Sequence, residues 1–395
     1  MKRLFIYFTF LTILVISCKK LTPKLPEDHQ ILEGPIKGLT AAEQDQFLKG
    51  DIGFGAVFTP QNGLGPIFVA NSCASCHAGD GKGHPFTTLT RFGQTDSTGN
   101  QFVQLGGPQL QNRAIPGYSP EIIPSGATSS KILPPANTGL GYLDAVSDQD
   151  LLLMSDPNDA DADGISGVPN WVNVPAYCQF RANAISMNGK HMARFGKKGA
   201  AYDLIQQTAN AYNQDMGINS TYESIDTYRK QPVEPEVSNT TLQNVVFYLK
   251  TLKAPVQRNA NDADVIAGKQ IFMSTGCDKC HRAELKTGSS PIKVLSNITF
   301  HPYTDLLLHD MGPALDDNYT EGSAKTSEWK TPALWGLGLS KKSQGGSYFL
   351  MHDGRAHSID EAIQLHGGEA LQIRLAYGNL SMTERDQLLK FLESL

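Results

Sequence analysis

The order of apolar and polar residues predicts amphipathic helices in the second half of the chain. Residues 239–253 carry apolar side chains at the three- and four-residue spacing that lines one face of an α-helix, namely Leu242, Val245, Val246, Leu249 and Leu252. Pro255 is expected to end this helix, because proline lacks the backbone N–H that a helix needs. Residues 261–274 predict another helix, which includes Val265, Ile266, Ile271 and Phe272 and leads into the second half.

Capping signals predict three further helix starts. In a capping box, a Ser or Thr precedes the helix, and a Glu three residues later completes a reciprocal pair of hydrogen bonds. The pairs are Thr40 with Glu43, for a helix that stops near Gly50; Ser358 with Glu361, for one that ends at His366; and Ser381 with Glu384, for one that runs to Leu395 and buries Leu388, Leu389 and Leu392. Residues 50–135 are rich in Gly and Pro and predict mostly loop.

The first residues have the pattern of an export signal. Lys2 and Arg3 precede an apolar run over residues 4–16, which is shorter than the roughly 18 residues that a membrane-spanning helix needs. The run closes with Val15-Ile16-Ser17-Cys18, the form of a lipobox. An ordinary signal peptide that is cleaved elsewhere is the alternative.

This pattern predicts where the protein resides. Residues 1–17 would be a lipoprotein signal peptide, and Cys18 would become the lipidated first residue of the mature chain. Residues 18–40 are rich in Pro and Lys and would form the tether. We therefore expect an exported, lipid-anchored membrane protein that faces the periplasm or the cell surface.

Two Cys-x-x-Cys-His motifs carry the chemistry: Cys73-Ala-Ser-Cys76-His77 and Cys277-Asp-Lys-Cys280-His281. In such a motif the two thiols attach a haem covalently, and the histidine is the proximal iron ligand. A zinc ribbon usually brings its second pair within about 15–20 residues, whereas these pairs lie 204 residues apart. A redox dithiol needs no following histidine. The sequence therefore predicts two covalently bound haem c groups.

The remaining cysteine and the net charge say less about function than the haem motifs do. With Cys18 lipidated and four thiols used by haem, only Cys178 is left, so a disulfide framework is excluded. Cys178 is interpreted as a small buried apolar residue, with a reactive thiol as the alternative. The net charge of −5 becomes −7 once Lys2 and Arg3 are removed, which suits a basic electron-donor protein. No basic stretch suits nucleic acid.

The helices and haem motifs together define the expected fold. A cytochrome c domain has a helix before its Cys-x-x-Cys-His motif and a closing helix after it. We expect a mostly α protein with two cytochrome c-like haem domains and long loop-rich insertions. The N-terminal haem domain would span residues 41–254 and the C-terminal cytochrome c domain residues 255–395.

An acidic segment between the haem motifs predicts a calcium site. Asp159, Asp161, Asp163 and Ile165 stand at positions 1, 3, 5 and 7 of a loop of the EF-hand type, whose oxygens surround Ca²⁺. The twelfth position is Asn170, where a bidentate Glu is expected. The alternative is a solvated acidic turn.

Several motifs give a resemblance to a known family. They are residues 296–299, residues 301–312, Glu328-Trp-Lys-Thr-Pro-Ala-Leu-Trp-Gly336, His352-Asp-Gly-Arg355 and residues 361–370. Over roughly residues 50–395 the chain resembles the bacterial di-haem oxidoreductases, which are similar in turn to di-haem cytochrome c peroxidases and MauG. The resemblance implies reduction of hydrogen peroxide with electrons from a small cytochrome or cupredoxin, and commonly a homodimer.

The resemblance also implies ligands for the second haem. In the peroxidases and MauG, the sixth ligand follows a His-x-Gly turn by fourteen residues. Counting from His352 gives His366, so the pair His281 and His366 is expected at that iron. Met311 or His309 is the rival ligand, and a surface histidine at a helix end is the other reading of His366.

For the first haem, the resemblance implies an open face beside two polar residues. The block that contains Leu204-Ile-Gln-Gln207 and Asp215 is similar to one that places a glutamine and an acid there. Gln207 would orient peroxide and Asp215 would move its proton. An ordinary amphipathic helix with exposed glutamines is the alternative. His84 could close this face, although a loop position is expected for it.

One departure affects electron transfer between the haems. The relatives place a tryptophan ten residues before the glutamine, and here that position is Lys197. Trp171 is a candidate substitute. Two other functions therefore stay open: a non-enzymatic membrane-tethered electron carrier, and MauG-like oxidation of a partner. The second is weakened because His366 stands where MauG has tyrosine.

Overall fold

The computed structural model describes residues 31–93 and 102–395. The predicted signal peptide (residues 1–17) and the lipidation site Cys18 lie outside the described residues. Leu32–Leu395 form one compact unit, and the domain boundary expected between residues 254 and 255 stays a prediction. Within the described ranges, no helix is both long and apolar enough to cross a membrane.

The expectation of a mostly α fold is wrong. Of the described residues, 34% are helical and 13% lie in strands or bridges. The strands are short and form five small antiparallel sheets: β1 (Ile67–Phe68) with β3 (Arg113–Ala114), β2 (Leu89–Phe92) with β4 (Ser129–Ile132), β5 (Asn170–Val172) with β7 (Lys190–Ala193) and β6 (Ser186–Met187), β8 (Leu285–Lys286) with β9 (Thr299–Phe300), and β10 (Leu308–Asp310) with β11 (Glu328–Lys330). Strands of two to four residues are too short to show a period of two, which is why the pattern missed them.

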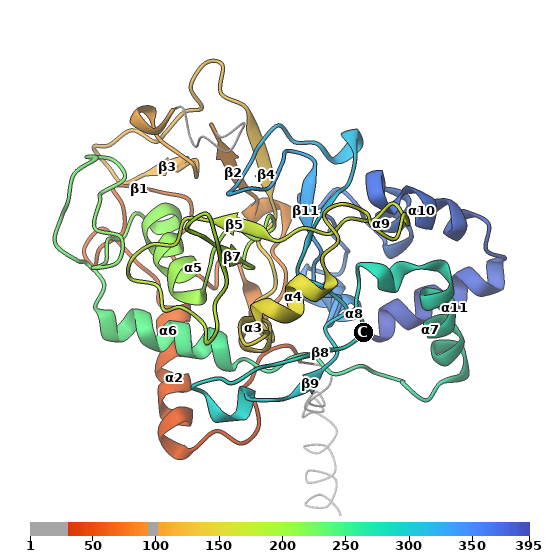
Figure 1. The fold of residues 1–395 in the computed structure, drawn as a ribbon. Coiled ribbons are helices and arrows are strands. Elements are labelled where there is room, and N and C mark those ends of the chain that lie inside the picture. Colours follow the sequence, from red (N-terminus) through yellow and green to blue (C-terminus); the bar gives the residue numbers. More distant parts are fainter. Residues whose placement is uncertain (1–30, 94–101) are drawn as a thin grey trace, which may run out of the picture. The chain divides into compact units, whose positions relative to one another are not determined.

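In the first half, α2 (Ala41–Gly55) crosses α6 (Asn239–Thr251), as Figure 1 shows. The Thr40 capping box is confirmed. The helix continues past Gly50, where a Cβ atom would lie only 2.1 Å from the Asn244 carbonyl oxygen. Gly50 therefore permits a close helix crossing and does not end the helix. The core here also includes α5 (Leu204–Asn210) and the π-helical turn η5 (Ala211–Asp215).

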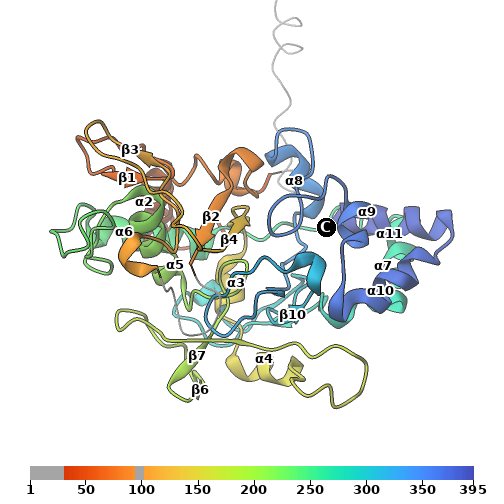
Figure 2. The same ribbon diagram turned by 90° about the horizontal axis from the view of Figure 1, so that it is seen from above.

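In the second half, α7 (Ala263–Thr275) packs along α11 (Met382–Ser394), and both views show them side by side (Figures 1 and 2). The Ser381 capping box is confirmed. On α7, Val265 and Phe272 are buried and Ile266 is exposed. Three shorter helices complete this half: α8 (Leu337–Ser343), α9 (Ile359–Gln364) and α10 (Leu371–Gly378).

A third apolar cluster combines residues from both halves, including Leu143, Met192, Phe300 and Trp335. It lies near α3 (Leu140–Asp144) and α4 (Asp148–Met154). Bridges between residues 146 and 287 and between residues 168 and 308 join the halves here. The remaining short helices are η2 (Ala78–Asp80), η3 (Pro85–Thr87), η4 (Val103–Leu105), η6 (Cys277–Lys279), η7 (Lys293–Leu295), η8 (Pro313–Leu315) and η9 (Gly368–Ala370).

Candidate functional site

The first Cys-x-x-Cys-His motif lies on the wall of a cavity of about 200 Å³, called cavity 1. The motif forms a tight turn, because the amides of Cys76 and His77 both donate to the Cys73 carbonyl, at 3.1 and 3.0 Å. Most of the remaining wall is apolar and comes from distant segments, among them Leu89, Leu140, Phe195, Leu204, Val245 and Leu249. The fold therefore builds an apolar chamber around the two thiols and the imidazole.

The His77 imidazole is neutral in this chamber. Burial lowers its pKa to about 4. Its Nδ1 atom faces the Pro135 carbonyl without a well-formed hydrogen bond. A neutral ring is what a metal ligand requires, since the ligating nitrogen must not carry a proton.

Gln207 and Asp215 lie on the wall of the same cavity. Asp215 ends the π-helical turn η5, and its carbonyl accepts hydrogen bonds from Val69 and Ala70 at 2.6 and 3.0 Å. Burial raises the pKa of its carboxyl to about 7, and the Arg91 charge opposes this only in part. The sequence therefore brings a protonatable acid and an amide to one wall of cavity 1.

His84 does not line cavity 1. Its Nδ1 accepts a hydrogen bond from the Phe86 amide at 3.2 Å, and its ring packs against Phe86 and Phe349 with centroids 4.7 and 4.8 Å apart. The loop position expected for His84 is thus what the structure has. Among the described residues on this wall, His77 is the only histidine, and the buried Met216 is the only thioether.

The second motif lies on the wall of cavity 2, of about 220 Å³, together with His366. The Nδ1 atoms of His281 and His366 are hydrogen-bonded to the carbonyls of Tyr303 and Ala362, at 3.0 and 2.7 Å. Such bonds fix the ring orientation and leave each Nε2 for a metal. Burial lowers both pKa values, that of His281 to about 4, and the two rings are close enough for His366 to contribute to that shift.

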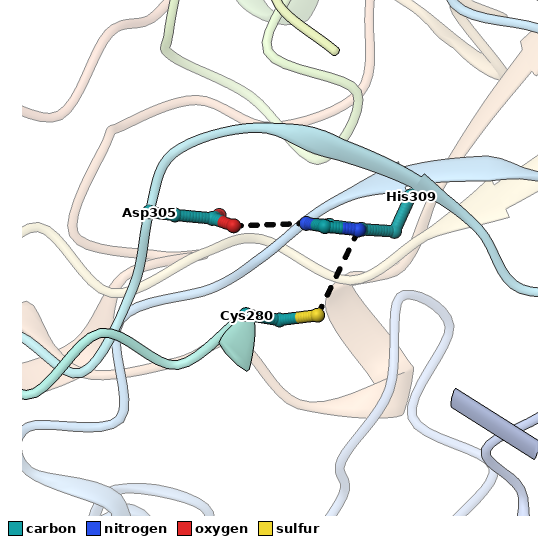
Figure 3. A group of neighbouring side chains, drawn as sticks. All are labelled: Cys280, Asp305 and His309. Atoms are coloured by element: carbon teal, nitrogen blue, oxygen red, sulfur yellow. Dashed lines mark hydrogen bonds and ion pairs between the residues drawn. The ribbon is translucent and has the colours of Figure 1, made fainter. Parts of the chain in front are cut away.

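The rival ligands Met311 and His309 also lie on this wall, but His309 is already engaged. Figure 3 shows its ring between Asp305 and Cys280: Nε2 is 2.9 Å from Asp305, and Nδ1 is 3.7 Å from the Cys280 sulfur and 2.7 Å from Glu369, which is not drawn. Burial alone would lower the pKa of His309, but its bonds to Asp305, Cys280 and Glu369 raise it to about 12. The ring is an imidazolium without a free lone pair, so it is a poor iron ligand.

Both cavities fit a covalently held haem by their donor sets. Each combines two thiols and one neutral imidazole from a single five-residue motif with a mainly apolar wall. A family model described as "Di-haem oxidoreductase, putative peroxidase" matches residues 131–395. The chain belongs to this di-haem oxidoreductase family. Haem is accordingly its cofactor.

Other comparisons add no argument. The curated proteins contain no match to the chain. Among solved structures, hydrazine synthase from Kuenenia stuttgartiensis is similar at 15% identity and a TM-score of 0.38, covering 95% of this chain and 98% of that one. A MauG-like protein associated with microbial copper homeostasis is similar at 14% identity and a TM-score of 0.33, covering 63% and 89%. Such TM-scores are too low to define a shared fold.

In this di-haem oxidoreductase, the acidic loop differs in detail from the expected calcium site. The carboxylates of Asp159 and Asp161 lie close together with that of Asp156, within 4.8 Å of one another. Asp163 instead forms an ion pair with Lys279 at 2.9 Å, and one of its oxygens accepts the Ile165 amide. Calcium at Asp159, Asp161, Asp163 and Ile165 stays a prediction.

Sequence reasoning did not find the wall that separates the cavities. Trp329 lines cavity 2, where its ring stacks on His352 at 3.8 Å, and Trp335 lines cavity 1. Lys197 lies on both walls, whereas Trp171 lies on neither. The only signal was that both tryptophans belong to the motif of residues 328–336. Cys178, expected to be a small apolar residue, is 8% exposed, and no described cysteine is in a disulfide.

Proposed function

We propose that this protein is a c-type di-haem peroxidase that reduces hydrogen peroxide with electrons from a small cytochrome or cupredoxin. The observation that carries the proposal is the difference between the two cavities. Cavity 1 combines one imidazole with Gln207 and Asp215. Cavity 2 is lined by four histidines, of which His281 and His366 are held by backbone carbonyls at Nδ1 so that each Nε2 is left for a metal. The first suits a reaction on a small substrate, and the second suits electron transfer.

The residues that would hold the haems follow from the donor sets. Cys73, Cys76 and His77 would hold the first haem, and Cys277, Cys280 and His281 the second, with His366 as its other ligand. When bound, the haems supply the electron storage and the metal at which peroxide is reduced. His281 and His366 would both hold the second haem, which suits that site to electron transfer.

Asp215 would supply a proton for cleavage of the O–O bond. Reduction of H₂O₂ to two waters consumes two electrons and two protons, and the departing oxygen must be protonated as the bond breaks. With a pKa of about 7, the carboxyl is protonated in about half of the molecules at neutral pH. It can therefore donate a proton and be reprotonated from solvent.

Gln207 would position the peroxide. No described residue forms a hydrogen bond with its side-chain amide, which lines cavity 1 and can both donate and accept. The apolar remainder of the wall would limit water and strengthen this contact. The two residues come from α5 and η5, so one continuous helical segment sets the distance between them.

The partners and location follow from the sequence predictions. A lipid at Cys18 would hold the protein at the outer side of a membrane. This location fits the haem motifs, because bacteria attach haem c outside the cytoplasm. The net charge of −5 suits a basic electron donor. A homodimer and a calcium ion at the acidic loop belong to the same proposal, because the resemblance and the loop pattern support them.

The first experiment tests where the haems are. Replacing Cys73 and Cys76 by Ala should remove one haem per chain from the pyridine haemochrome assay, and replacing Cys277 and Cys280 should remove the other. Cys178→Ala is the matched control and should retain both. Purified protein should also turn over H₂O₂ with a reduced small cytochrome; two bound haems without turnover would contradict the peroxidase.

A non-enzymatic electron carrier is the second candidate, and one observation favours it. Met216 is buried and lines cavity 1, and a thioether can ligate haem iron. A carrier with both irons closed would not bind CO when reduced. CO binding to the ferrous wild type supports the peroxidase, while CO binding only after Met216→Leu supports the carrier.

A further inference from the structure

The two cavities share part of their walls, and that shared part is cationic. Among the described residues, four line both cavities: Lys82, Lys197, Lys330 and Pro332. Three of the four are lysines from segments far apart in the sequence. We call these three residues the lysine partition.

Backbone contacts hold the three lysines in place. The Lys330 amide donates to the Lys197 carbonyl at 3.0 Å, which joins the end of β11 to the turn after β7. Gly199, in that turn, leaves room for the Lys330 stem, because a Cβ atom there would lie 3.2 Å from Lys330 Cδ.

Lys82 is positioned by its neighbour Gly83. The Gly83 amide donates to the Pro134 carbonyl at 2.9 Å, and its carbonyl accepts from the Gln344 side chain at 2.8 Å. A side chain at Gly83 would meet Pro134 Cδ at 2.7 Å. The Lys82 loop is therefore fixed against residues of both halves.

The adjacent Lys198 shows how this protein satisfies a buried ammonium group. Its Nζ donates to the carbonyls of Lys325, Thr326 and Glu328, at 3.1, 2.9 and 2.9 Å. It also lies 3.8 Å from the centre of the Trp329 ring. No such bonds and no ion pair within 4.0 Å engage Lys82, Lys197 or Lys330 among the described residues.

The partition therefore has positive charge without a matching negative charge. Burial lowers the pKa of Lys82 to about 8. Burial, together with the Lys82 and Lys330 charges, lowers that of Lys197 to about 7, and Asp353 opposes the shift only in part. For Lys330, burial lowers the pKa to about 8 against an opposing effect of Asp305. The three half-buried lysines lie together on one wall with no carboxylate within 4.0 Å among the described residues, so an anion is the expected partner.

We infer that Lys82, Lys197 and Lys330 bind the propionate carboxylates of both haems at the shared wall and thereby raise the reduction potentials of the two haems together. The inference rests on the proposed placement of one haem in each cavity. Each haem carries two carboxylates, and carboxylates pair strongly with ammonium groups where water is excluded. Reduction adds a negative charge at iron, so a nearby cation favours the reduced state.

Spectroelectrochemical titration of the purified protein with both haems bound tests this inference. Lys197→Met and Lys330→Met should each shift both haem couples to lower potential, and Lys197→Arg should keep the wild-type values. Lys269→Met, which removes an exposed lysine on α7, is the control and should shift neither couple. A shift of only one couple, or of none, in the Met variants overturns the inference.

Haem content separates this inference from the proposed function. If the Cys-to-Ala variants keep both haems, the placement of the haems is wrong. If the placement holds and the potentials do not move, only the lysine partition is wrong. Where Lys197→Met fails to bind haem, Lys197→Gln decides: bound haems with wild-type potentials overturn the inference, and lowered potentials support it.

A soluble anion is the other source of a negative charge. Adding inorganic phosphate at constant ionic strength distinguishes the two sources. Wild-type potentials that do not respond to phosphate support propionates as the partners. Potentials that respond in the wild type but not in Lys197→Met assign the partition to a soluble anion and overturn the inference.

Discussion

Cavities 1 and 2 begin from the same five-residue motif and have similar volumes, about 200 and 220 Å³, yet they differ in the other residues on their walls. The wall of cavity 1 also carries the Gln207 amide and the Asp215 carboxyl, which has a pKa of about 7. Burial raises the pKa of both thiols of the first motif, and Asp215 is close enough to raise both further. The wall of cavity 2 also carries the His366 imidazole and His309, which is bound by two carboxylates.

The difference shows that the attachment motif does not decide the role of a haem site. In each half the distinguishing residues lie far downstream of the motif. They are on α5 and η5 for cavity 1, and for cavity 2 His366 lies just after α9, which ends at Gln364 and not at His366 as expected. A reactive site needs an open position and a proton donor. An electron-transfer site needs both positions filled, so that its iron changes charge with little rearrangement.

The largest effect is expected from Asp215→Asn. The amide has the same shape but cannot donate the proton, so the kcat of peroxide reduction should fall by about 10²–10⁴-fold. Haem content should not change. Asp51→Asn, at an exposed position of α2, is the matched control. Activity within twofold of the wild type in Asp215→Asn would show that Asp215 is not the proton donor. Cavity 1 would then lack the proton donor that distinguishes it from cavity 2.

His366→Ala should convert cavity 2 into a site that resembles cavity 1. Losing one imidazole opens the iron, so the low-spin signal of the ferric protein should disappear and a second high-spin signal should replace it. His357→Ala is the control, because this exposed histidine lies just before α9. An unchanged low-spin signal in His366→Ala would point to Met311 as the ligand instead.

The next largest effect is expected in the pH dependence of peroxide turnover, which should follow Asp215 of cavity 1. Because burial raises the pKa of Asp215, its protonated fraction is nearly complete below pH 6, about half at pH 7, and falls about tenfold per unit well above that. Turnover of peroxide should follow this fraction and decline as pH rises through 7. The residual activity of Asp215→Asn should lack the decline; a decline that persists there would assign it to another group.

The smallest effect is expected from removing calcium. Of the two haem sites, only the one in cavity 2 should respond. The acidic loop touches that cavity through Ser166, whose amide and hydroxyl donate to Glu369 at 3.0 and 2.7 Å, and through the ion pair between Asp163 and Lys279. A chelator should lower the melting temperature. The free energy of unfolding should fall by about 2.7 kcal/mol when calcium at 100 times its Kd is removed.

A matched variant tests the calcium prediction. Asp159→Asn with Asp161→Asn should abolish the response to calcium, while Asp51→Asn should retain it. The potential of the second haem should respond to calcium and that of the first should not. An equal response of both haems, or none to calcium at all, would contradict the expected link between the loop and cavity 2.

The sequence predicted well what is encoded locally. The capping boxes at Thr40 and Ser381 are confirmed, since four adjacent residues determine them. At Ser358 only the bond from the Glu361 amide forms, because the Glu361 carboxylate accepts from the His357 amide instead. The apolar face of α6 is likewise confirmed, from Leu242 to Leu252. The predicted end of α2 was wrong because Gly50 is needed where α6 packs closely against α2, and the local sequence does not reveal that contact.

Only the site residues that belong to a motif, or lie at a spacing known from the family, could be predicted from the sequence. Counting residues brought His366 to the wall that carries His281, and Gln207 and Asp215 to the wall that carries His77. The lysine partition had no such signal, since Lys82, Lys197 and Lys330 meet only through tertiary contacts. The carboxylate clamp on His309 depends on Glu369, sixty residues away.

A low-temperature EPR spectrum of the purified ferric protein tests the contrast between the cavities most directly. We expect one axial high-spin signal from the haem at His77 and one low-spin signal from the haem between His281 and His366. Two low-spin signals that persist after addition of one electron per protein would show that both irons are closed, and they would contradict a peroxidase with its reactive site in cavity 1.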